Sequence, residues 1–79
     1  MRVVLYTRDG CHLCDDAKAA LARIGVEYAE VDIAGDPELT AEYGERIPVV
    51  MLDGREHGYW RVEEARLLRD LENPVSEPG

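Results

Sequence analysis

Hydrophobic and polar residues are arranged along the chain in short segments, and the spacing within each segment predicts its secondary structure. Residues 1–7 contain the unbroken apolar run Val3-Val4-Leu5, which indicates a strand buried on both faces of a sheet. The apolar residues of segment 11–24 recur at helical spacing: Leu13, Ala17, Ala20, Leu21 and Ile24. Gly25 then favours the end of that helix, and the alternating residues 26–33 favour an edge strand.

A second helix and a hairpin are predicted in the middle of the chain. Asp36-Pro37-Glu38 combines an N-cap carboxylate, a proline at the first helical position and an acidic first turn, so a short helix begins there and ends at Gly44. Residues 47–52 form the next apolar run, and Asp53-Gly54 after it is a strong turn signal. Residues 55–60 are therefore expected to return as an antiparallel strand.

The last predicted element is a helix over residues 62–71. Its apolar positions form a wide face: Ala65, Leu67, Leu68 and Leu71. Asn73-Pro74 ends this helix, because proline cannot continue it. We therefore expect residues 1–72 to form one domain and residues 73–79 to form a flexible C-terminal tail.

The resulting order of elements, β-α-β-α-β-β-α, predicts an α/β fold. The first two strands are joined through a helix and lie parallel by a right-handed crossover, whereas the two hairpin strands lie antiparallel. A mixed four-stranded sheet with helices on both faces satisfies both constraints. The 79 residues leave no room for a second domain.

The charge of the chain argues against two classes of partner. Nine basic and 17 acidic residues give a net charge of −8, so nucleic acid and anionic membrane surfaces repel the chain. No apolar run approaches the ~20 residues of a membrane-spanning helix, and the first residues lack the apolar core of a signal peptide. We therefore expect a monomeric, cytoplasmic protein whose thiols stay reduced.

The segment Cys11-His12-Leu13-Cys14 carries the clearest chemistry. It follows a buried strand and a short loop, and it stands where the first helix begins. Unpaired backbone N–H groups and the positive end of the helix dipole favour a thiolate at that position. Cys11, at the very start, is predicted to attack a substrate disulfide. Cys14 lies one turn later and is expected to be more buried, so it is predicted to resolve the mixed disulfide.

Other uses of these residues stay open at this point. Two cysteines at this spacing also form half of many zinc sites, but a closed site needs four ligands, so we predict no resident metal. His12 stands beside the pair, where a protonated imidazole would stabilise the Cys11 thiolate or would simply be exposed. His57 lies far along the chain and is expected on the surface of the returning strand.

Pro48 is the second informative residue. Proline is tolerated at the start of a strand for backbone reasons alone. Behind a C-x-x-C pair and two α/β units, however, it predicts a cis Ile47–Pro48 bond placed against the cysteines. Such a bond would leave the backbone of Ile47 available to pair with an extended substrate as an added strand.

Two segments, Thr-Arg-Asp-Gly-Cys-His-Leu-Cys at 7–14 and Arg-Ile-Pro-Val-Val at 46–50, resemble the glutaredoxin-like branch of the thioredoxin-fold family. The resemblance covers about residues 2–72 and keeps the order and spacing of both motifs. It implies a thioredoxin-like fold and a thiol–disulfide oxidoreductase, with Cys11 as nucleophile, Cys14 as resolving cysteine and Pro48 as cis-proline. Arg8 stands where glutaredoxins often carry a basic residue that meets a glutathione carboxylate.

Two departures from typical glutaredoxins bear on the electron donor. His12-Leu13 replace the usual Pro-Tyr between the cysteines, so a stacking tyrosine is lost. Typical members also carry Gly-Gly followed by Asp before the last helix, whereas residues 57–62 here are His-Gly-Tyr-Trp-Arg-Val. We therefore expect glutathione to be a poor electron donor and another thiol reductant or a reductase to serve instead. Tyr59 and Trp60 in this stretch are expected to be buried by packing.

The resemblance leaves two functions open besides reduction of a disulfide in a protein or small molecule. One is an iron–sulfur or metal carrier in which Cys11 thiolates from two chains hold a cluster. The other is a redox-regulated binding module. Carriers in this family usually keep one cysteine and a glutathione site, whereas this chain has both cysteines. An oxidoreductase with no bound cofactor is therefore the favoured interpretation.

Overall fold

The computed structural model describes residues 2–72, and the predicted tail at 73–79 lies outside that range. Within it, four strands and three α-helices follow one another in the predicted order. Their bounds are β1 Val3–Thr7, α1 His12–Arg23, β2 Ala29–Asp32, α2 Pro37–Tyr43, β3 Val49–Leu52, β4 Arg55–Tyr59 and α3 Glu64–Glu72, with a short 3₁₀ turn at Ile33–Gly35 before α2.

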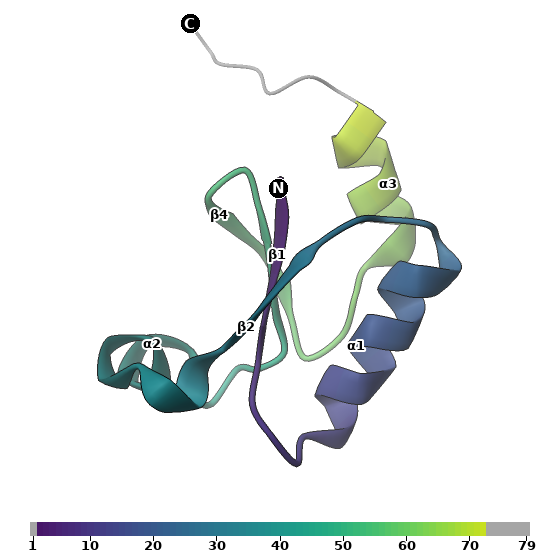
Figure 1. Cartoon of the computed structure of the whole chain (residues 1–79). Coiled ribbons are helices and arrows are strands. Elements are labelled where there is room, and N and C mark those ends of the chain that lie inside the picture. The colour runs from purple at the N-terminus through teal and green to yellow at the C-terminus, as the bar shows by residue number, and fades with distance from the viewer. Residues whose placement is uncertain (1, 73–79) are drawn as a thin grey trace, which may run out of the picture.

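The strands form one mixed sheet in the order β2-β1-β3-β4 (Figure 1). β1 and β2 run parallel, with Val4 opposite Ala29, as the right-handed crossover requires. β3 pairs antiparallel with both β1 and β4. The predicted parallel pair, the predicted hairpin and the edge position of β2 are therefore confirmed.

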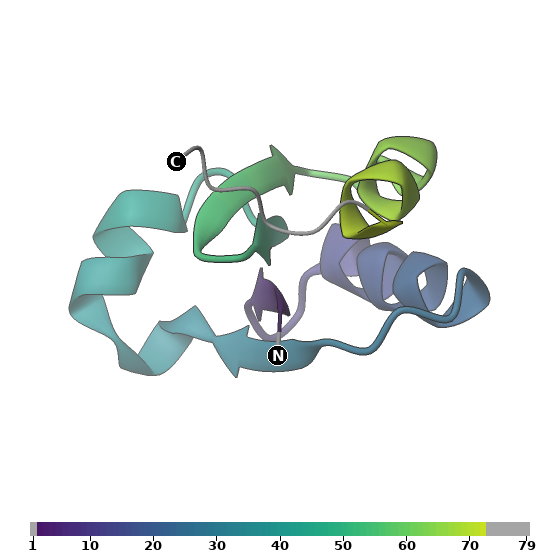
Figure 2. The same ribbon diagram turned by 90° about the horizontal axis from the view of Figure 1, so that it is seen from above.

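The helices lie on both faces of the sheet, as predicted. Figure 2 shows α1 and α3 side by side on one face and α2 on the other. Val3 and Leu5 of β1 point to the first face and pack with Leu21 of α1 and Leu67 of α3. The alternate β1 residues pack on the second face, against a separate cluster that includes Tyr43 of α2. Only the first set is fully buried, because a single short helix covers the second face.

Local signals explain where the first two helices begin. Gly10 has a φ of +79°, a left-handed conformation that glycine adopts without steric cost, and it turns the chain into α1. Cys11 is the N-cap of α1. Asp36 caps α2, where its carboxylate accepts hydrogen bonds from the N–H groups of Glu38 at 2.9 Å and Leu39 at 3.2 Å.

The bounds of three predicted elements and one predicted face are wrong. The strand predicted over residues 47–52 begins at Val49, because the chain enters it through the cis Ile47–Pro48 bond. β2 has four residues instead of the eight predicted, because the Val26 N–H is still bound to the Leu21 carbonyl in the turn that ends α1. The last helix begins at Glu64, two residues later than expected. Its apolar face is also narrower than expected, since Leu67 is buried but Leu68 is 38% exposed.

Candidate active site

The two cysteines lie together at the start of α1 in different environments. Both are reduced, and the Cys14 N–H donates a hydrogen bond to Cys11 Sγ at 3.1 Å. Cys11 is partly exposed, whereas Cys14 is only 1% exposed. The more accessible sulfur is therefore the one at the N-cap of α1, where a backbone N–H points at it.

The environment of Cys14 disfavours its thiolate. Burial raises the pKa of Cys14 to about 12, and the hydrogen bond with Cys11 adds to the increase, while the Arg8 backbone opposes it. Cys14 is therefore protonated at neutral pH. An accessible thiol beside a buried, protonated one is the arrangement that an attacking and a resolving cysteine need.

The segment before β3 lies against these cysteines. The Ile47–Pro48 peptide bond is cis. Ile47 belongs to the buried cluster that contains Cys14, and Cys11 packs against the same cluster. The hydrogen-bonded ladder between β3 and β1 begins at Val49, so Ile47 lies just outside the sheet. The Pro48 carbonyl accepts a hydrogen bond from the Trp60 N–H at 2.8 Å.

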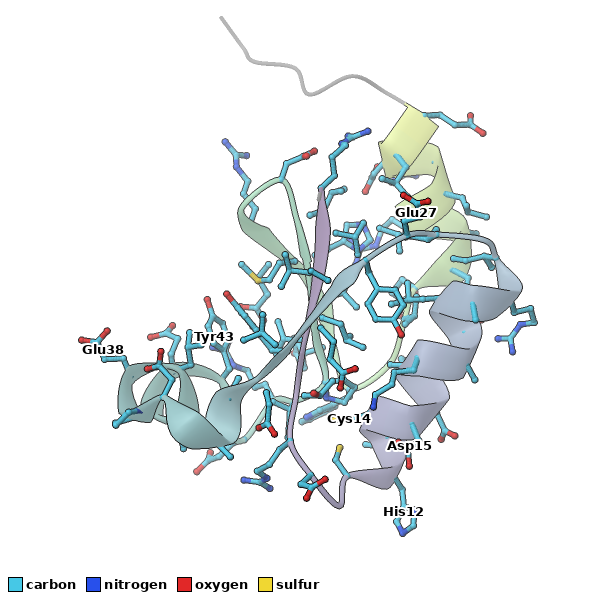
Figure 3. The ribbon with its side chains drawn as sticks, viewed as in Figure 1. His12, Cys14, Asp15, Glu27, Glu38 and Tyr43 are labelled. Carbon is cyan, nitrogen blue, oxygen red and sulfur yellow. The ribbon has the colours of Figure 1, made fainter. Side chains whose placement is uncertain are left out.

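Arg8 and His12, the other predicted site residues, are both exposed beside Cys11. The Arg8 guanidinium forms no ion pair with any carboxylate in residues 2–72, which leaves it accessible to a substrate. Figure 3 shows His12 at the start of α1, pointing away from the body of the protein. His12 is therefore exposed, and its effect on the Cys11 thiol stays a prediction.

Tyr59 and Trp60 are not buried, contrary to expectation. They are 46% and 53% exposed, and their rings form an edge-to-face pair with centroids 5.0 Å apart. Trp60 has a φ of +70°, a conformation that costs a bulky residue about 1–3 kcal/mol. Hydrogen bonds from its backbone N–H to Pro48 and from its indole N–H to the Glu45 carbonyl, the latter at 3.3 Å, hold it there. The hydrogen bond between Trp60 and Pro48 places these two aromatic residues next to the candidate site.

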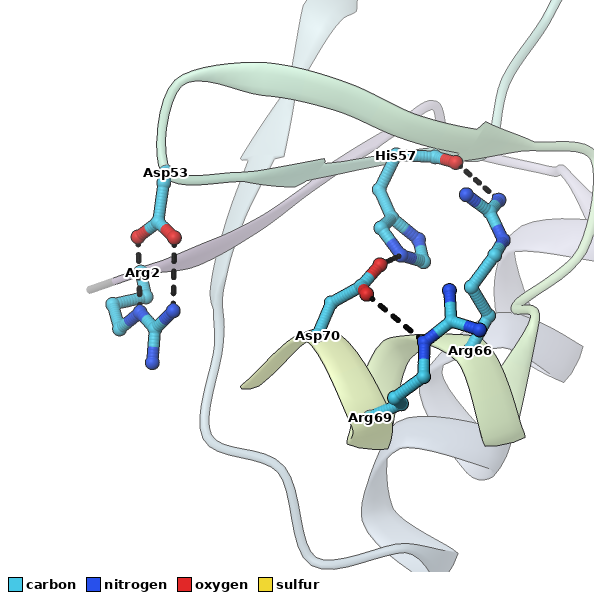
Figure 4. Close-up of polar contacts among 6 residues, drawn as sticks. All are labelled: Arg2, Asp53, His57, Arg66, Arg69 and Asp70. Atoms are coloured by element: carbon cyan, nitrogen blue, oxygen red, sulfur yellow. Dashed lines mark hydrogen bonds and ion pairs between the residues drawn. The ribbon is translucent and has the colours of Figure 1, made fainter. Parts of the chain in front are cut away.

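The prediction that His57 lies on the surface is also wrong. Its side chain is 6% exposed, and its Nε2 lies 2.8 Å from Asp70 Oδ2 on α3 (Figure 4). The same hydrogen bond lowers the pKa of Asp70. Arg66 of α3 donates a hydrogen bond to the His57 carbonyl. These contacts tie β4 to α3, and none of them involves a cysteine.

No three His, Cys, Asp or Glu side chains within residues 2–72 are grouped closely enough to hold a metal ion. No helix in that part of the chain is long and apolar enough to cross a membrane.

Comparison with known proteins decides the family. The model of the glutaredoxin-like domain family (DUF836) matches residues 2–72. The chain belongs to this family. An uncharacterised protein of Mycobacterium tuberculosis is 46% identical to this glutaredoxin-like protein over 79 residues, which cover 89% of this chain and 81% of the relative.

Solved structures agree with this assignment. The X-ray structure of a protein from X. campestris has a TM-score of 0.77 and 40% identity, covering 91% of this chain and 99% of that one. The solution structure of a glutaredoxin from Brucella melitensis has a TM-score of 0.65 and 36% identity, covering 90% of this chain and 80% of that one. The glutaredoxin-like, thioredoxin-type fold is therefore confirmed, and together with the cysteine pair it indicates a thiol redox function.

Proposed function

We propose that this glutaredoxin-like protein is a thiol–disulfide oxidoreductase that reduces protein disulfides in a reducing compartment, the cytoplasm. The observation that carries the proposal is the contrast between the two thiols. Cys11 is partly exposed at the N-cap of α1, and its Sγ accepts a hydrogen bond from the Cys14 N–H, whereas Cys14 is buried and protonated. One thiol is therefore ready to attack, and the other is held in reserve one helical turn away.

The catalytic cycle has two exchange steps. In the first, the Cys11 thiolate attacks one sulfur of a substrate disulfide, a mixed disulfide forms, and the other substrate sulfur leaves as a thiolate that takes up a proton. In the second, Cys14 loses its proton and attacks Cys11 Sγ. The Cys11–Cys14 disulfide forms, the bond from Cys11 to the substrate breaks, and the second substrate thiol leaves. An external dithiol then reduces the protein again and is itself oxidised to a disulfide.

The surface around Cys11 favours a polypeptide as the substrate. Leu13 is 48% exposed between the two cysteines, and Tyr59 and Trp60 are exposed next to Pro48. Exposed aromatic and aliphatic side chains provide contact area that suits a protein chain more than a small charged thiol. The Ile47 backbone lies outside the ladder between β1 and β3, and we propose that it pairs with an extended segment of the substrate.

The start of α3 disfavours glutathione as the electron donor. Glu63 and Glu64 lie where a helix N-terminus would otherwise attract a carboxylate. The pocket next to it is lined by Glu56, His57, Gly58, Tyr59, Glu63 and Arg66. Its two glutamate carboxylates outnumber its single arginine guanidinium, so it does not attract an anion. Arg8 remains as a cationic contact, but a single exposed ion pair contributes only ~0–1 kcal/mol. We propose a dithiol reductant or a protein reductase as the donor.

A side-by-side turnover assay tests this assignment. Reduction of a protein disulfide is followed with glutathione and glutathione reductase in one arm and with thioredoxin reductase or dithiothreitol in the other. We expect the second arm to be faster, and Cys14→Ser to accumulate mixed disulfides that Cys11→Ser cannot form. Faster turnover with millimolar glutathione would overturn the choice of donor. Mixed disulfides formed through Cys14 would overturn the assignment of the two cysteines.

A further inference from the structure

The resolving step requires Cys14 to form a thiolate, and the two cysteines by themselves do not favour it. Cys14 attacks only as a thiolate, yet its burial and its hydrogen bond with Cys11 hold its pKa at about 12. A positive charge close to Cys14 would reduce the cost of forming that thiolate.

Lys18 is the cation placed to act on Cys14. It follows Cys14 by four residues on α1, so the two side chains lie on the same face of the helix, one turn apart. Its Nζ lies 3.0 Å from Glu30 Oε2 on β2. The same carboxylate oxygen accepts a hydrogen bond from the Thr7 hydroxyl at 2.9 Å. Thr7 is only 3% exposed, so the carboxylate that holds Lys18 is itself held by a buried group at the end of β1.

The other ionisable groups around this site are few. On α1, Asp15 lies 3.9 Å from Lys18, and Tyr28 and Asp32 act electrostatically on Lys18 and Glu30 from the β2 side. Glu30 raises the pKa of Lys18, which therefore keeps its positive charge at neutral pH. The buried residues clustered with Cys14 are apolar: Ile33, Ile47, Val49 and Met51. The titratable side chains packed against this cluster are Cys11, Tyr6 and Tyr43, and none of them carries a positive charge. Lys18 lowers the pKa of Cys14 against the larger effect of burial.

We propose that Lys18, fixed by Glu30 and Thr7, is a positioning residue that stabilises the Cys14 thiolate during resolution of the mixed disulfide. The inference rests on the proposed oxidoreductase function and adds a residue to it. In this step the Cys14 proton passes through solvent to the departing substrate thiolate, the Cys14–Cys11 bond forms, and the bond from Cys11 to the substrate breaks. No further oxidant or reductant is needed. The alternative is that the Lys18–Glu30 pair only ties α1 to β2.

A two-phase reaction with dithionitrobenzoate separates the two exchange steps. Attack by Cys11 releases the first thionitrobenzoate, and attack by Cys14 on the mixed disulfide releases the second. The test variant is Lys18→Gln, whose amide can still donate to Glu30 but carries no charge. Lys18→Arg restores the charge. Arg23→Gln makes the same charge change on the same helix, nine residues from Cys14 instead of four, and serves as the matched control.

We expect Lys18→Gln to slow the second phase roughly three- to tenfold at pH 7 and to change the first phase less than twofold. Lys18→Arg and Arg23→Gln should leave the second phase within about twofold of the wild-type rate. A second phase in Lys18→Gln that stays within twofold of wild type, or that falls equally in Arg23→Gln, overturns the proposal. Loss of the first phase in the wild-type protein would instead overturn the oxidoreductase function itself.

A measurement of Cys14 ionisation near neutral pH excludes a purely structural effect. In a Cys11→Ser background, the rate at which iodoacetamide alkylates Cys14 at pH 8, where Lys18 keeps its positive charge, reports the thiolate concentration. Lys18→Gln should lower this rate roughly three- to tenfold, since one pKa unit corresponds to tenfold in thiolate concentration, and Lys18→Arg should restore it. An unchanged alkylation rate combined with a slower second phase would assign Lys18 a structural role and contradict the proposal.

Discussion

The sharpest quantitative prediction concerns the reactivity of Cys14 when it is the only thiol. Cys11→Ser leaves a single cysteine, because the chain has two. A free thiol with a pKa near 8.5 is about 3% thiolate at pH 7. With its pKa at about 12, Cys14 of the wild type has about three-thousandfold less thiolate; the substitution removes the contribution of Cys11 but leaves burial, the main cause. Its 1% exposure also limits access to moments when the start of α1 opens.

Alkylation by iodoacetamide, followed by intact mass, measures this difference. Folded Cys11→Ser should react at least a hundredfold more slowly at pH 7 than the same variant unfolded in urea, which provides an internal control. Folded Cys14→Ser should react at least as fast as an unfolded thiol. If Cys14 in the folded Cys11→Ser variant is alkylated within tenfold of the unfolded rate, the argument from burial and protonation is refuted.

The pKa of Cys14 is raised in the folded state, so the stability that its proton contributes is complete below pH about 9 and is lost as the pH rises towards 12. Over that range, the urea midpoint should therefore fall more in the reduced wild type than in Cys14→Ala. Asp36→Ala removes the N-cap of α2 and should lower the free energy of unfolding by about 1 kcal/mol in urea titrations, whereas a loss near zero would mean that the cap is not used in solution. Trp60→Ala should reduce kcat/KM for a protein disulfide by about fivefold or more and leave the first phase with dithionitrobenzoate unchanged; equal losses for both substrates would argue against a docking role.

Features encoded by neighbouring residues could be predicted from the sequence. The start of α2 depends on Asp36 and Pro37 alone, and the start of α1 depends on a short loop followed by Cys11. Their side chains act on backbone groups two or three residues away, so local sequence determines the result. The order of the strands follows from chain connectivity and handedness in the same way.

Features that depend on a distant partner could not be predicted. The backbone N–H of Trp60 is hydrogen-bonded to the Pro48 carbonyl, which holds Trp60 in its exposed position. The His57 ring is hydrogen-bonded to the Asp70 carboxylate on α3, which holds the ring against that helix. Neither partner is evident from the residues next to it in the sequence. Lys18 and Glu30 meet only because α1 packs beside β2, so their pairing needed the folded structure. Sequence periodicity identifies elements, whereas contacts between elements depend on how those elements pack.

The central claim is that Cys11 and Cys14 form a catalytic dithiol, and the most direct measurement of it is the reduction of insulin disulfides by dithiothreitol. Precipitation of the reduced insulin chains is followed by turbidity, with Cys11→Ser and Cys14→Ser at the same concentrations as controls. We expect the wild-type protein to accelerate the reaction well above the rate with dithiothreitol alone and Cys11→Ser to give no acceleration. A wild-type rate equal to that background, or full activity in Cys11→Ser, would contradict it.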